Sequence, residues 1–157
     1  MKVEAVKNKT IPAKKPEVTV ETVLVAHKAL AGAKLSKLEY NDLKKVSKAI
    51  RALKHAAKDY DELMEIGLQG LKDKEWEKDE KLRERFTELT PDQQYKINKS
   101  TEEFNRKLIK LRRDENEKAA ELRDYERISE DALEKLLEGN PDLTGEEIVA
   151  IQDVLLA

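Results

Sequence analysis

Apolar residues recur with strict 3-4 spacing between Leu43 and Leu71. This spacing places them along one side of a helix and is typical of a helix that packs lengthwise against another helix. The nine positions of this seam are Leu43, Val46, Ile50, Leu53, Ala57, Tyr60, Met64, Gly67 and Leu71. The pattern predicts a long helix over about 36–71 that begins at a capping box of Ser36 and Glu39.

A second seam follows the helix start Thr90-Pro91-Asp92-Gln93, in which threonine caps and proline takes the first helical position. Its members are Ile97, Thr101, Phe104, Leu108, Leu111, Leu122 and Tyr125, with a polar gap at Glu115 and Lys118. The pattern predicts a helix over about 91–125. Because both seams have the same length, we predict a long antiparallel hairpin in which Ile50 and Leu53 contact 104–111.

Three shorter helices are predicted towards the ends of the chain, over 19–32, 129–138 and 144–156. Gly32 suits a left-handed C-terminal cap for the first of them. The tetrapeptide Thr144-Gly145-Glu146-Glu147 has the spacing of a capping box for the last. These short helices, packed on the long hairpin, complete a predicted all-α fold.

Two segments stand apart from the helical seams. Residues 1–18 carry five lysines, and Pro12 and Pro16 interrupt any regular structure, so we predict a basic N-terminal arm. Residues 72–81 hold nine charged side chains and one tryptophan, which predicts an exposed connection or a frayed helix. The remaining residues, 19–157, are expected to form a single helical domain.

Composition fits long solvated helices better than a thick core, because charged residues make up 41% of the chain and aromatic residues 4%. The chain has no cysteine, which excludes disulfides and thiolate sites. No apolar run reaches the roughly 18 residues that a membrane span needs. The N-terminus also lacks the apolar region of a secretory signal. We therefore expect no membrane partner.

The net charge of −2 hides a strong segregation of charge along the chain. Residues 34–58 hold eight basic side chains against two acidic ones, a net of +6. Residues 129–157 hold eight acidic side chains against one basic one, a net of −7. Opposite charge in two segments of one chain favours attraction between them, or between neighbouring copies.

Candidate metal ligands are sparse in this sequence. His27 and His55 have no second histidine at a metal-ligand offset, which favours core-edge and surface roles for them. The stretch 140–145 imitates the start of an EF-hand loop, but Ile151 stands where the twelfth position needs a bidentate glutamate. We therefore predict no metal site and no cofactor.

Paired carboxylates invite comparison with helical nucleotide pyrophosphohydrolases, which hold magnesium with such pairs. Glu62 and Glu65 lie on one predicted long helix, and Glu121 and Asp124 lie on the other. All four project away from the apolar seams, and a chain this charged contains such pairs by chance. With no glycine-rich phosphate loop either, we predict no catalytic residue and no small-molecule substrate.

A basic stripe is predicted on the back of the first long helix, roughly opposite its seam. Its members are Lys37, Lys44, Lys48, Arg51, His55 and Lys58. Such a stripe can track phosphates, but it lacks the interleaved aromatic residues of single-strand binders. The favoured interpretation is that this back of the helix is simply solvated. Binding to nucleic-acid phosphates is the second interpretation, and binding to an acidic protein partner is the third.

The last predicted helix has apolar residues on more than one side, whereas a surface helix needs only one apolar stripe. Contiguous exposed apolar surface usually marks an interface. We therefore predict a homo-oligomer, most simply a dimer, that weakens when 144–157 are removed. The candidate self-association residues are Val149, Val154, Leu155 and Leu156.

Three stretches of sequence resemble a family of small all-helical bacteriophage proteins with no assigned activity. They are the Ala/Leu helix Val23-Leu24-Val25-Ala26-His27-Lys28-Ala29-Leu30, the segment with Leu35, Tyr40 and Leu43-Lys44-Lys45-Val46-Ser47-Lys48-Ala49-Ile50, and the C-terminal stretch 143–155. The resemblance covers the first ~60 and last ~15 residues, and the middle is longer and more charged than the family pattern. It implies phage origin and supplies no site residues.

Together these features predict a non-enzymatic, phage-encoded protein that binds another protein, first of all another copy of itself, as a virion or assembly component. Its expected location is the host cytoplasm or the virion. Two alternatives stay open. One is nucleic-acid binding through the basic stripe, and the other is inhibition of a host defence protein.

Overall fold

The computed structural model describes residues 18–72 and 74–157, and these residues form an all-α fold, as the seams predict. The helices are α2 (Val20–Ala31), α3 (Tyr40–Leu71), α4 (Lys74–Glu84), α5 (Pro91–Asn116), α6 (Glu130–Glu138) and α7 (Gly145–Leu155), with a 3-10 turn at Phe86–Glu88. Except for Val18, the predicted N-terminal arm lies outside the described residues.

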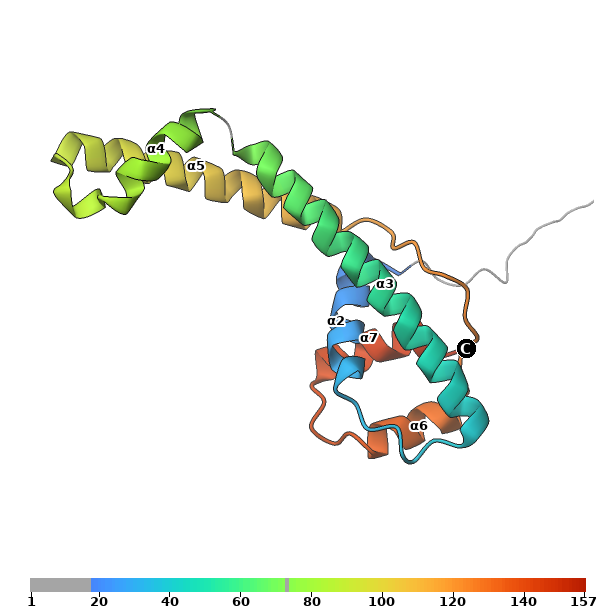
Figure 1. The fold of residues 1–157 in the computed structure, drawn as a ribbon. Coiled ribbons are helices and arrows are strands. Elements are labelled where there is room, and N and C mark those ends of the chain that lie inside the picture. Colours follow the sequence, from blue (N-terminus) through green and yellow to red (C-terminus); the bar gives the residue numbers. More distant parts are fainter. Residues whose placement is uncertain (1–17, 73) are drawn as a thin grey trace, which may run out of the picture.

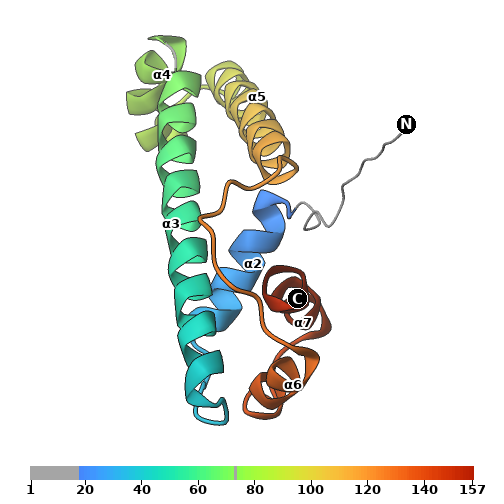
Figure 2. The same cartoon turned by 90° about the vertical axis from the view of Figure 1, so that its right-hand side faces the viewer.

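One helix, α3, joins the two parts of the molecule (Figure 1). Its 32 residues make about 48 Å of helix. The first half of α3 lies with α2, α6 and α7 in what we call the head (Figure 2). The second half leaves the head and lies with α4 and α5 in what we call the arm. The fold is therefore elongated, as a hairpin requires, but its core lies at one end.

The hydrophobic core lies in the head, where every helix contributes to it. The largest fully buried side chains are Leu30, Leu53, Ile128, Leu136, Ile151, Leu155, Val23, Val46 and Val154. α3 contributes the seam positions Val46 and Leu53, so its predicted apolar side is the side that the head covers. Helix α2 packs on both α3 and α7 and holds the head together.

Helices α5, α6 and α7 begin at the capping residues that the sequence predicts. Thr90 and Gln93 form both bonds of a capping box at α5, and Thr144 and Glu147 form both at α7. Hydrogen bonds from the backbone and side chain of Thr144 lower the pKa of Glu147. Ser129 caps α6 through its hydroxyl. These caps rest on residues three positions apart, so the chain forms them without help from distant segments.

Two predicted helix ends differ in the structure. The capping box of Ser36 and Glu39 does not form, and α3 begins at Tyr40 after a turn. The Asn140 side chain contacts the loop between α2 and α3, where it accepts a hydrogen bond of 2.7 Å from the Lys34 amide and donates one of 2.8 Å to the Lys34 carbonyl. Gly32 has φ −102°, so the left-handed cap predicted there is wrong.

Helix α5 ends at Asn116, nine residues before the predicted end at Tyr125. The break falls at the polar gap of the seam, where a helix has nothing apolar to bury. Residues 117–129 form an extended connection that crosses the head (Figure 2). It pairs with the start of α2 through Ala120 N to Val18 O at 2.7 Å, and with the end of α7 through Ile128 N to Leu155 O at 2.8 Å.

Apolar residues of the second seam still reach the core from this connection. Tyr125 packs against the core and donates a hydrogen bond of 2.6 Å from its hydroxyl to the carbonyl of Val154. Burial raises the pKa of the Tyr125 hydroxyl above its ordinary value. Arg127 donates to the carbonyls of Asp153 and Leu156 at 2.8 and 3.1 Å and so satisfies the end of α7.

The arm is the part of the predicted hairpin that does form. Gly67 of α3 faces Leu111 of α5, because a Cβ at Gly67 would lie 2.6 Å from Leu111 Cδ2. Leu53 is 14 residues, or about 21 Å, further along α3. Leu53 packs in the head cluster, where Ile50 is only partly buried. The predicted contact of these two residues with 104–111 is therefore wrong.

Of the two structures expected for residues 72–81, an exposed connection or a frayed helix, the helix forms over most of the segment, in α4. Trp76 holds this helix on α5 by stacking on Phe104 with ring centroids 4.0 Å apart. The Arg83 guanidinium lies 3.5 Å from the Trp76 ring and donates to Ser100 and Thr101 at 3.0 and 3.2 Å. A cation–π and stacking cluster thus orders the tip of the arm.

The two helical glycines of α3 test the register of the arm. Gly70→Ala should raise the free energy of unfolding by up to about 1 kcal/mol, since nothing lies within 4 Å of the added methyl group. Gly67→Val should instead lower it by about 1–3 kcal/mol, because the larger side chain displaces Leu111. Urea unfolding followed by circular dichroism measures both. Equal stabilisation at the two positions would contradict the Gly67–Leu111 contact.

Candidate interaction surfaces

The basic stripe lies on the side of α3 that faces away from the head core. Lys44, Lys48, Arg51 and Lys58 are exposed there. Lys37 is also exposed, but it precedes α3 and lies in the turn at 36–38. Lys44 Nζ lies 5.5 Å from the ring of Tyr40, which places an exposed aromatic residue at one end of the stripe.

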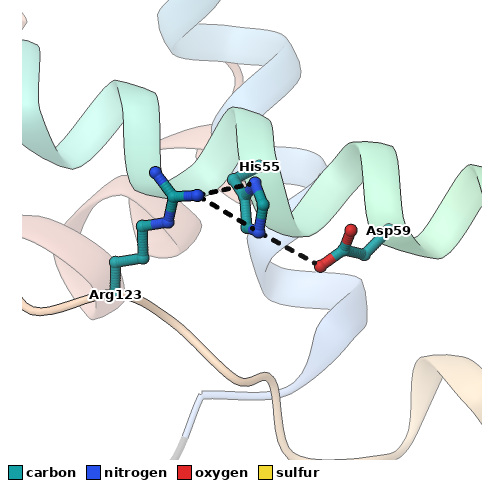
Figure 3. A network of polar contacts seen from close by, with 3 residues as sticks. All are labelled: His55, Asp59 and Arg123. Atoms are coloured by element: carbon teal, nitrogen blue, oxygen red, sulfur yellow. Dashed lines mark hydrogen bonds and ion pairs between the residues drawn. The ribbon is translucent and has the colours of Figure 1, made fainter.

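His55 links this stripe to the extended connection (Figure 3). Arg123 Nη2 lies 3.2 Å from His55 Nδ1, and Asp59 Oδ2 lies 3.4 Å from His55 Nε2. Because arginine only donates, His55 can bond to Arg123 only as an acceptor, and its Nε2 faces the Asp59 carboxylate. Arg123 adds a cation to the stripe from 68 residues away in sequence, a distance that no local pattern bridges.

The four predicted self-association residues separate into different environments. Val154 and Leu155 are fully buried in the head, and Leu156 is partly buried. Their apolar character is explained within one chain, so assigning Val154 and Leu155 to a surface between copies was wrong. Val149 alone is largely exposed, with 55% of its surface accessible.

Ion pairs within the head do not follow the predicted segregation of charge. Lys135 contacts Glu39 at 3.4 Å, which reverses the predicted signs of the two segments. Lys45 contacts Glu126 at 3.8 Å, outside the acidic segment 129–157. Within the described part of the chain, no ion pair joins a cation of 34–58 to a carboxylate of 129–157. The attraction of basic 34–58 to acidic 129–157 therefore does not appear as ion pairs among these described residues.

The paired carboxylates lie on two different kinds of structure. Glu62 and Glu65 are exposed on α3, whereas Glu121 and Asp124 lie on the extended connection because α5 ends before them. In the pyrophosphohydrolase arrangement the two carboxylate pairs lie on facing helices. Glu121 and Asp124 do not lie on a helix here, so this arrangement does not form. Among residues 18–72 and 74–157, no group of three or more His, Asp or Glu side chains is placed to hold a metal ion.

A groove that the sequence did not indicate lies where the head meets the arm. We call it the junction groove; its volume is about 350 Å³. Its apolar lining is Val20, Val23, Leu24, Ala56, Leu63, Ala119 and Ala120. At its polar side, Glu115 pairs with Lys118 at 2.7 Å. Tyr60 also lines the groove, and burial raises the pKa of its hydroxyl. Ile66, one turn beyond Leu63, is 70% exposed and extends this apolar surface along the arm.

A second groove of about 400 Å³ lies between α2 and α7. We call it the acidic groove, because three carboxylates and no basic residue line it. Its residues are Glu21, Thr22, Val25, Gly145, Glu146, Val149, Ala150 and Asp153. The exposed Val149 therefore lies inside a groove rather than on a flat surface.

Comparison with known proteins gives no match to a family model, to a curated protein or to a solved structure. The fold and the surfaces therefore carry the functional argument. None of the helices in the described ranges combines the length and the apolar composition that a membrane span requires.

Proposed function

We propose that this protein is a non-enzymatic, phage-encoded interaction protein that serves as a virion or assembly component, in the host cytoplasm or the virion, and associates with other copies of itself. The observation that carries the proposal is the apolar surface running from the junction groove to Ile66. Phage origin rests on the resemblance of the N-terminal and C-terminal segments to small phage proteins.

The shape of this surface favours a protein over a small molecule. The junction groove is open, and its apolar lining continues onto α3 through Leu63 and Ile66. Covering an aliphatic side chain fully contributes about 1.5–3 kcal/mol, so two such residues anchor a partner segment. The adjoining polar pair of Glu115 and Lys118 supplies a rim. Because the arm projects from the head, this surface has room for a partner.

A photoreactive benzophenone amino acid in place of Ile66 tests this surface. In cells that make the protein with its natural partners, we expect a cross-link to one defined protein, identified by mass spectrometry. The same amino acid at Glu65, exposed on another side of α3, is the control. Identical cross-linking from both positions, or none from Ile66, would remove the basis of the proposal.

Nucleic-acid binding is the second candidate, and the exposed row of cations on α3 favours it. If the stripe is only solvated, binding should be weak and vanish near physiological salt, since few phosphates are neutralised. Fluorescence anisotropy with labelled DNA and RNA measures this directly. Sub-micromolar binding at about 150 mM salt, lost in Lys48→Glu with Arg51→Glu, would make nucleic-acid binding the better assignment.

A further inference from the structure

The acidic groove combines an apolar lining with charged side chains. Val25, Val149 and Ala150 are apolar residues of its lining, and Glu21, Glu146 and Asp153 are its three carboxylates, which we call the rim. No ion pair between described residues engages the three rim carboxylates, so the rim keeps a charge of −3. A ligand that complements it presents an apolar group followed by cations.

The outer side of α3 has this composition. Tyr40 is 72% exposed, and Lys44, Lys48 and Arg51 follow it at intervals of three and four residues. This spacing aligns the four side chains in one row. We call this row the basic edge. It joins one large apolar group to a charge of +3, and no ion pair between described residues neutralises those cations.

The two surfaces are also similar in length. Tyr40 and Arg51, the ends of the basic edge, are 11 residues apart on α3, which is about 17 Å, and Gly145 and Asp153 are eight residues apart on α7, which is about 12 Å. We propose that the basic edge of one copy of this chain binds the acidic groove of a second copy. Tyr40 then meets the apolar lining of the groove, and the cations face its carboxylates. The proposal rests on the proposed function as a self-associating protein and names its surfaces.

The placement of the two surfaces decides the symmetry of the assembly. Val20 and Leu24 line the junction groove with α3, whereas Glu21 and Val25 line the acidic groove with α7. The acidic groove therefore opens on the side of α2 away from α3, and Figure 2 shows α2 between these helices. Each copy offers its edge to one neighbour and its groove to another. Such head-to-tail contacts form rings or open rows rather than two-fold dimers.

The strength of this contact should depend steeply on salt. Exposed ion pairs are individually weak and screened by ions, and the contact is small beside stable interfaces. In sedimentation velocity, we expect the mass to rise with protein concentration over tens of micromolar. Raising the salt from about 50 to about 500 mM should weaken association about tenfold.

Charge reversal on each surface tests the pairing. One variant carries Lys44→Glu with Lys48→Glu, which makes its edge acidic. The other carries Glu146→Lys with Asp153→Lys, which makes its groove basic. Each variant alone should stay monomeric, because its edge and groove then repel. An equimolar mixture of the two should associate again, since each edge now faces a groove of opposite charge. All four positions are exposed, and circular dichroism confirms that each variant is folded.

A matched control carries Glu134→Lys with Glu138→Lys, which makes the same change of charge on exposed positions of α6 outside the groove. It should associate like the unchanged protein. A monomeric unchanged protein, a mixture that stays monomeric, or a control that also loses association would overturn the proposal. So would association of the unchanged protein only after nucleic acid is added. The cross-link from Ile66 is measured separately, so losing this contact and losing the proposed function are distinguishable.

Discussion

Replacing Leu53 by alanine should lower the free energy of unfolding by about 2–5 kcal/mol. Leu53 is fully buried in the head cluster, and α2 and α7 both pack against α3. Truncating it removes apolar burial and leaves a cavity that helices packed from several directions cannot close. Urea unfolding followed by far-ultraviolet circular dichroism measures the change.

Leu63→Ala is the matched control for this substitution. It removes the same atoms from the same helix, but Leu63 is an exposed large hydrophobic residue at the junction groove. We expect a loss of less than about 1 kcal/mol there. The chain has one tryptophan, Trp76, in the arm. Its fluorescence reports unfolding of the arm and so distinguishes it from unfolding of the head. Equal effects of the two leucine substitutions would mean that the head has no such core.

The features that could be predicted from sequence are those that neighbouring residues determine. The capping boxes at Thr90 and Thr144 form because their partners lie three residues away. The seam of α3 places Val46 and Leu53 correctly on the covered side, because helical periodicity is local too. The identity of the covering helix is not local. Identical seam lengths suggested α5, but α2 and α7 cover this half of α3.

The end of α5 shows a second limit of prediction from sequence. Residues 117–125 have no helix breaker, and their alanine, glutamate and lysine residues favour helix. Tertiary pairing of the connection with α2 and α7 outweighs this preference. The polar gap at Glu115 and Lys118 was the only local sign. The connection lines the junction groove, and the packing of α2 on α7 forms the acidic groove, so neither groove could be read from the chain.

The exposed cations on α3 lie at the other extreme, because local periodicity is enough to align them. It placed Lys44, Lys48 and Arg51 together on the back of the helix. The same periodicity puts Tyr40, four residues before Lys44 in the predicted helix, in this row, but the predicted stripe was defined by its basic residues alone. The structure starts α3 at Tyr40 and so puts an aromatic residue at the end of the row.

Removing 144–157 should abolish the folded head rather than only weaken association. The deletion removes Ile151, Val154 and Leu155, all fully buried. At about 1.5–3 kcal/mol for each side chain, their loss is comparable to the whole net stability of a domain, about 5–15 kcal/mol. The truncated protein also leaves Tyr125 and Arg127 without the carbonyl groups that they bind. We expect the cooperative unfolding transition to disappear and the amide hydrogens of α2 to exchange fast.

Two point variants distinguish this outcome from a general effect of shortening the chain. Val154→Asp places an unpaired carboxylate in the core and should reproduce the loss of the folded head. Val149→Ser changes the exposed residue of the same helix and should leave the unfolding transition within about 0.5 kcal/mol of the unchanged protein. If the truncated protein kept a cooperative transition and slow exchange in α2, helix α7 would not belong to the core. The buried residues of α7 would then be free to lie between copies, as the sequence pattern alone suggested.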